Sequence, residues 1–155
     1  MGQYGFSDAA NDLAVVHLDT DPGITPAQLP TAGLLSALDL RGQTFTTVGY
    51  GRTRDDKTKG PNNIVPNVDP DVRNVATQEF RSLQPALITL SQNPSTGDGG
   101  WCYGDSGGAN FLGESNIIVS TSVYIDSACR AHARGYRLDT EFPRQFLASQ
   151  GVPLP

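Results

Sequence analysis

The sequence has few charges, few cysteines and no long apolar segment. No window of about 18 consecutive apolar residues occurs, so we expect no membrane-spanning helix. Charged residues make up 17%, the formal net charge is −5, and no basic cluster offsets it, which argues against nucleic acid as a partner. The residues after Met1 form neither a basic nor an apolar stretch, so no export signal is expected there. Low charge with 17 glycines and 11 prolines is instead typical of an all-β protein.

Short apolar runs between turn residues predict the strands of a single domain covering residues 1–155. We expect these strands at residues 11–18, 44–51, 75–80, 86–91, 116–124 and 134–138. Residues 54–74 are polar and contain several prolines, which predicts a long surface loop. A short C-terminal helix is expected from Thr140 as N-cap to Gly151, with Pro143 in its first turn and with Phe142, Phe146 and Leu147 on one face. Several strands at turn-marked intervals suggest a barrel.

Residues 102–108 read Cys-Tyr-Gly-Asp-Ser-Gly-Gly and place Ser106 between glycines. A nucleophilic serine needs an exposed hydroxyl and free backbone N–H groups aimed at the developing oxyanion, and glycines permit the turn that provides them. The heptapeptide resembles the nucleophile loop of the chymotrypsin-like (trypsin-fold) serine endopeptidases, with Ala109 in place of the usual proline. Residues 11–14 (Asn-Asp-Leu-Ala) also resemble that family's aspartate motif. Asp12 precedes Ser106 by 94 positions, close to the family's spacing of about 93.

The resemblance implies a role for each matching residue. Ser106 would be the acylated nucleophile, and the backbone N–H groups of Gly104 and Ser106 would form the oxyanion hole. Asp12 would orient a catalytic histidine. Asp105 resembles the aspartate that pairs with a new N-terminal ammonium after zymogen processing and thereby shapes the oxyanion loop.

The resemblance also implies a substrate pocket, with Gly100 at its base and Tyr124 and Gly135 at its walls. A glycine at the base argues against the acidic pocket that selects Lys or Arg. From the sequence alone, Cys102 and Cys129 could be a disulfide or two buried thiols. The family pairs these two positions as one wall of the pocket, which implies a disulfide, an oxidising compartment and therefore a secreted protein.

The histidine of the triad has no counterpart at the expected position. The family's spacing puts it about 33 positions before Met1. His17 lies five residues after Asp12 on the expected strand, so it should face the opposite side, roughly 16 Å away. His132 is expected in a loop, and with Cys129 it makes only two candidate metal ligands, so we expect neither a metal nor another cofactor.

These features predict the C-terminal half of a family member: a six-stranded antiparallel Greek-key barrel with a short C-terminal helix, from which the N-terminal barrel is absent. The expected function is serine-type peptide hydrolysis, inactive in this chain alone, with a peptide or protein substrate and the missing N-terminal barrel as partners. One alternative is a pseudoprotease or interaction module that binds through the exposed cleft face. A weaker one is an esterase-type hydrolase. Residues 137–140 resemble bacterial trypsin-like proteins, or else Arg137 and Asp139 form a structural pair.

Overall fold

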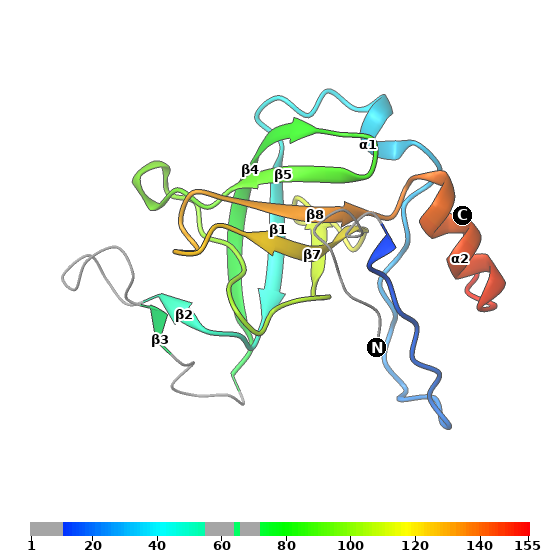
Figure 1. Cartoon of the computed structure of the whole chain (residues 1–155). Coiled ribbons are helices and arrows are strands. Elements are labelled where there is room, and N and C mark those ends of the chain that lie inside the picture. Colours follow the sequence, from blue (N-terminus) through cyan, green and yellow to red (C-terminus); the bar gives the residue numbers. More distant parts are fainter. Residues whose placement is uncertain (1–10, 55–63, 66–71) are drawn as a thin grey trace.

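Six strands close into an antiparallel barrel in the computed structural model, which describes residues 11–54, 64–65 and 72–155 (Figure 1). Their order around the barrel is β1 (Thr44–Gly49), β4 (Asn74–Leu83), β5 (Leu87–Ser91), β8 (His132–Arg137), β7 (Ile118–Ile125) and β6 (Ala109–Leu112). Outside it lie a two-stranded ribbon, β2 (Thr53–Arg54) with β3 (Ile64–Val65), and the helices α1 (Leu34–Ala37), η3 (Pro94–Thr96) and α2 (Glu141–Ser149). The expected all-β barrel with a short C-terminal helix is confirmed.

The barrel interior is filled by residues that alternate along the strands. Ile88 and Leu90 on β5 and Phe45 on β1 are fully buried, and Val119 and Ala133 reach the same core from β7 and β8. A period of two places alternate side chains on one face of a strand. Full burial of a Leu, Ile or Phe side chain stabilises by about 1.5–3 kcal/mol. These short apolar runs therefore form strands because each contributes to one shared core.

The sequence analysis missed one barrel strand and a short two-stranded ribbon. Strand β6 was not predicted, since Ala109–Leu112 follows the glycine loop directly and is too short to display a pattern. The loop expected at residues 54–74 contains part of the β2–β3 ribbon, in which Arg54 pairs with Ile64. The other barrel strands lie within a few residues of their predicted positions.

The strand expected at residues 11–18 is wrong, because this segment belongs to no ladder among the described residues. No backbone hydrogen bond of the described part of the chain involves residues 14–20. Val16 and Leu18 are 81% and 66% exposed, and Ile24, farther along, is 73% exposed. An apolar run favours a strand only where a neighbouring strand covers it, and the described barrel does not supply one here.

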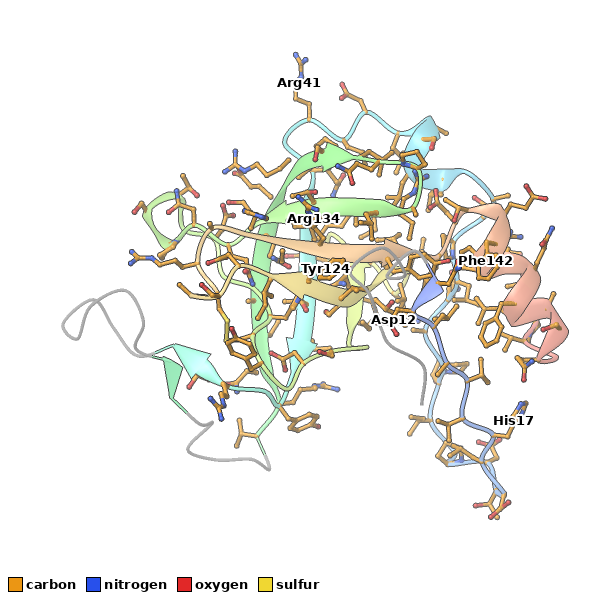
Figure 2. The ribbon with its side chains drawn as sticks, in the orientation of Figure 1. Asp12, His17, Arg41, Tyr124, Arg134 and Phe142 are labelled. Carbon is orange, nitrogen blue, oxygen red and sulfur yellow. A yellow bond between two sulfur atoms is a disulfide. The ribbon has the colours of Figure 1, made fainter. Side chains whose placement is uncertain are left out.

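Helix α2 begins and ends where the sequence predicts, and it lies at one end of the barrel (Figure 1). Thr140 occupies the N-cap position without a side-chain hydrogen bond, and Gly151 follows the helix with a φ of 78°. Leu147 is buried, but Phe142 is half-exposed, so the three expected apolar residues do not share one buried face (Figure 2). Among the residues that the structure describes, no helix has the length and apolarity to cross a membrane.

Arg137 and Asp139 join β8 to α1 as a buried ion pair. The guanidinium donates through Nε to Asp139 Oδ1 at 2.9 Å and through Nη2 to Asp139 Oδ2 at 2.8 Å. The remaining N–H groups of Arg137 donate to the Gln84 carbonyl and to the Ser36 hydroxyl. Asp139 Oδ2 also accepts the N–H of Leu35, in the first turn of α1. These charges therefore have a structural role, which was one of the two interpretations of the sequence.

Candidate active site

The loop with Ser106 connects η3 to β6 and is attached to the rest of the barrel by a disulfide. Cys102 and Cys129 are bonded, with their Cα atoms 5.4 Å apart, so the expected disulfide is present. Cys129 lies in the β7–β8 connection, where it adopts a φ of 50°. The loop therefore has a covalent link to a strand connection that is far away in the sequence.

Asp105 links the same loop to the end of β1. Its Oδ1 accepts the N–H of Gly51 at 2.7 Å, and its Oδ2 accepts the N–H of Cys102 at 2.9 Å. The carboxylate approaches so closely that a Cβ at Gly49 would overlap it and a Cβ at Gly51 would lie 2.5–2.7 Å from its atoms. The position of Asp105 therefore favours glycine at both residue 49 and residue 51. The expected ammonium partner of Asp105 is untested.

Ser106 is exposed, and the backbone around it turns sharply. Gly104 and Gly107 have φ values of 98° and 79°, a region that favours glycine. The N–H of Gly107 donates to the Ser122 carbonyl at 2.8 Å, which aligns the loop with β7. Within the described residues, the N–H groups of Gly104 and Ser106 donate to nothing, and the Ser106 hydroxyl has no partner. An exposed serine hydroxyl and two uncommitted backbone donors thus occur within three residues.

A cavity of about 700 Å³ lies beside this loop. Gly100, Trp101, Cys102 and Asp105 line it from the loop, and Cys129 lines it across the disulfide. The size lies within the range of about 300–1,000 Å³ that is usual for ligand sites. A small organic group or a peptide side chain would fit.

Asp126 organises the backbone of the β7–β8 connection, which also carries Cys129. Its carboxylate accepts backbone N–H groups, those of Ala128, Arg130, Ala131 and His132. Burial raises the pKa of Asp126, but these hydrogen bonds outweigh it and leave the pKa below the usual value. The ionised carboxylate therefore holds the turn that carries Cys129.

The sequence profile of the family described as Trypsin matches residues 2–138. The chain belongs to the trypsin family. The search of curated proteins finds no match. A solved structure, the scabies mite inactivated protease paralogue S-I1, is similar with 14% identity and a TM-score of 0.48, over 81% of this chain and 52% of that one. This trypsin-family chain thus spans about half the length of that structure.

The described residues of this trypsin-family chain do not assemble a Ser-His-Asp triad. Asp12 and His17 are both exposed, and Figure 2 shows His17 farther along the N-terminal segment than Asp12 and away from the barrel. His132 is exposed at the start of β8. Within the described part of this chain, neither imidazole contacts Ser106 or Asp12, and the Asp12 carboxylate has no partner. Nor do three metal-ligating side chains gather there.

The three expected pocket residues of this trypsin-family chain lie in different surroundings. Gly100 lines the cavity, whereas Tyr124 and Gly135 are not among its lining residues. Tyr124 is paired with Arg134 across β7 and β8 (Figure 2). Gly135 packs closely against the buried Ser120. Gln92 lines the cavity too, and sequence reasoning missed it because no local motif marks an isolated buried glutamine.

Proposed function

We propose that this chain is the nucleophile-bearing barrel of a secreted serine endopeptidase, and that it needs a histidine from polypeptide beyond these 155 residues. The observation that carries the proposal is the exposed Ser106 hydroxyl beside the uncommitted N–H groups of Gly104 and Ser106. Backbone donors that need no reorganisation are what an oxyanion requires.

In the proposed reaction, Ser106 Oγ attacks the carbonyl carbon of a peptide bond while the supplied histidine takes the hydroxyl proton. The carbonyl oxygen becomes an oxyanion that accepts the N–H groups of Gly104 and Ser106. Collapse of this intermediate breaks the C–N bond, and the histidine gives its proton to the leaving amine. Water then hydrolyses the acyl-enzyme by the same route in reverse. Asp12 would hold the histidine in the required tautomer, as in the Ser-His-Asp triad.

The N-terminal segment has features that would let it bind a histidine-bearing polypeptide. Residues 14–20 have no backbone hydrogen bond within the described chain, and Val16 and Leu18 are exposed in the same stretch. An extended segment with unpaired backbone groups and exposed apolar side chains is suited to adding a strand from another polypeptide. Asp12 lies two positions before this segment, so a histidine-bearing barrel that paired here would bring its residues close to Asp12.

A second candidate function is an interaction module without catalysis. The observation that favours it is that neither histidine of the chain contacts Ser106 or Asp12 in the described residues. In that case the same exposed segment would bind a partner, and Ser106 would have no chemical role.

Labelling by a fluorophosphonate probe distinguishes the two functions. A general base contributes about 10²–10⁴-fold to such reactions, so the chain alone should label very slowly, and added imidazole should accelerate labelling of Ser106 by about tenfold or more. Ser106→Ala should abolish the signal. Ser127→Ala, an exposed serine on the neighbouring β7–β8 connection, should retain it. A folded chain whose Ser106 stays unlabelled with imidazole would support the interaction module, and fast labelling without any added base would refute the need for a supplied histidine.

A further inference from the structure

Two arginines line the cavity of about 700 Å³ beside the nucleophile loop. Arg52 is exposed and Arg130 is half-buried. Within the part of the chain that the structure describes, neither guanidinium donates a hydrogen bond or forms an ion pair. A guanidinium has five N–H donors in a fixed planar arrangement and no acceptor. The cavity therefore has two cationic groups whose donors are available to a ligand.

Backbone contacts hold both arginines next to the nucleophile loop. The N–H of Arg52 donates to the Tyr103 carbonyl at 2.8 Å. Arg130 directly follows Cys129, whose disulfide joins it to Cys102. The two arginines come from different connections of the barrel, one after β1 and one between β7 and β8. An occupant of the cavity would therefore meet both of them beside the loop that carries the serine.

The carboxylates of the cavity are already engaged. Asp98 accepts a backbone N–H at 3.2 Å and a threonine hydroxyl at 2.7 Å, and it pairs with Arg81 at 3.8 Å. Both oxygens of Asp105 accept backbone N–H groups. Because Asp98 has its own cation, the charges left to line the cavity are those of Arg52, Arg130 and Asp105, an excess of one positive charge. The cavity therefore favours an anion, although the whole chain has a net charge of −5.

We propose that this cavity binds the carboxylate side chain of a glutamate or aspartate in a peptide. Guanidinium and carboxylate groups form charge-assisted hydrogen bonds of matching planar geometry. The carboxylate would accept N–H groups of Arg52 and Arg130, and Gly100, which also lines the cavity, adds no opposing charge. A leucine would leave both cations unpaired, and a lysine would be repelled by them. The peptide would be the substrate of the proposed protease, so the proposal rests on that function, although binding itself needs no catalysis.

Calorimetric titration of the 155-residue chain tests this preference. The peptides are capped at both ends and differ in one side chain: glutamate, glutamine, leucine or lysine. We expect the glutamate peptide to bind about tenfold more tightly than the glutamine peptide, with about threefold from each partly exposed arginine. This advantage should shrink as salt rises from about 0.05 M to about 0.5 M, because salt screens exposed charges. Equal or tighter binding of another peptide, no binding of the glutamate peptide, or an advantage that salt leaves unchanged would overturn the proposal.

A further peptide distinguishes an acidic side chain from the end of a chain. The glutamine peptide with a free C-terminal carboxylate should bind no more tightly than its capped form. Binding as tight as that of the capped glutamate peptide would show that the site recognises a chain end, and would overturn the proposal.

Variants of the two arginines assign the preference to this cavity. Arg52→Gln and Arg130→Gln each remove one charge and should lower the preference for glutamate about threefold, and the double variant should abolish it. Their backbone N–H groups, which donate to Tyr103 and Asp126, remain in place. Arg41→Gln is the matched control, because Arg41 is exposed, does not line the cavity and points away from the barrel (Figure 2).

The pattern of losses decides the outcome. A preference that survives in the double variant, or that falls equally in Arg41→Gln, would contradict the proposal. A uniform loss for all four peptides would indicate a merely structural role for the arginines and would also contradict it. Failure of imidazole-supported labelling with the glutamate preference intact would refute the proposed function alone, whereas normal labelling without that preference would refute only this inference.

Discussion

Neutralising Asp139 should destabilise the barrel strongly, because the Arg137 guanidinium would remain buried without its counter-charge. Arg137 and Asp139 are 4% and 1% exposed, and their two hydrogen bonds are 2.8–2.9 Å long. Breaking such a buried pair from one side costs about 3–5 kcal/mol. Folded domains are stable by only about 5–15 kcal/mol, so Asp139→Asn should remove a large part of the total. At about 2–4 °C per kcal/mol, the melting temperature should fall by roughly 6–20 °C.

Urea denaturation followed by circular dichroism and by Trp101 fluorescence measures this loss. Adding Arg137→Met to Asp139→Asn removes the unpaired cation and keeps an acceptor for the Leu35 N–H, so the double variant should recover part of the stability, about 1 kcal/mol or more. Glu114→Gln neutralises an exposed carboxylate and should change the free energy of unfolding by less than about 0.5 kcal/mol. A loss below about 1 kcal/mol for Asp139→Asn, or no recovery in the double variant, would refute this reasoning.

Three further changes test other contacts. Gly51→Ala introduces a Cβ at 2.5–2.7 Å from the Asp105 carboxylate and should cost about 1–3 kcal/mol in urea denaturation; an unchanged midpoint would contradict the close approach. Burial raises the pKa of Tyr136 above its usual 10.0, so the neutral phenol stabilises the fold fully below that pH and this contribution is lost as pH rises above it. Tyr136→Phe removes a hydroxyl that has no partner among the described residues, so it should be neutral or stabilising by about 1 kcal/mol and should weaken the alkaline loss. Clear destabilisation would contradict the absence of a hydrogen bond. Because the pKa of Asp126 is lowered, its contribution to stability is present above the usual pKa of 3.8 and is lost as the pH falls below it. Asp126→Asn should reduce the loss of melting temperature at acid pH, and an unchanged loss would disprove the assignment.

Short sequence patterns predicted the elements that depend on interactions between residues close together in the chain. The alternation of Ile88 and Leu90 indicated β5, and the glycines around Ser106 indicated a tight turn. The strand expected at residues 11–18 failed because an apolar run does not reveal whether a partner strand covers it. Gln78 and Gln92 were missed for a related reason. The pairing of β4 with β5 and the hydrogen bond from the Gly99 N–H to the Thr77 carbonyl bring these two amides to Gly100, and such long-range contacts are not visible in a single sequence.

The contacts of the nucleophile loop separate two tasks of a serine protease. In the proposed reaction, positioning of the oxyanion donors would depend on backbone geometry, and the disulfide of Cys102, the hydrogen bonds of Asp105 and the Gly107–Ser122 hydrogen bond hold the backbone of this loop within one barrel. Proton transfer depends on a side chain, and neither imidazole of the described residues contacts Ser106. Because the positioning of the two donors needs no second barrel, this barrel can keep the same loop backbone whether or not a histidine is supplied. The loop geometry is therefore compatible with both the protease and the interaction module, and the response of Ser106 to an added base is what distinguishes them.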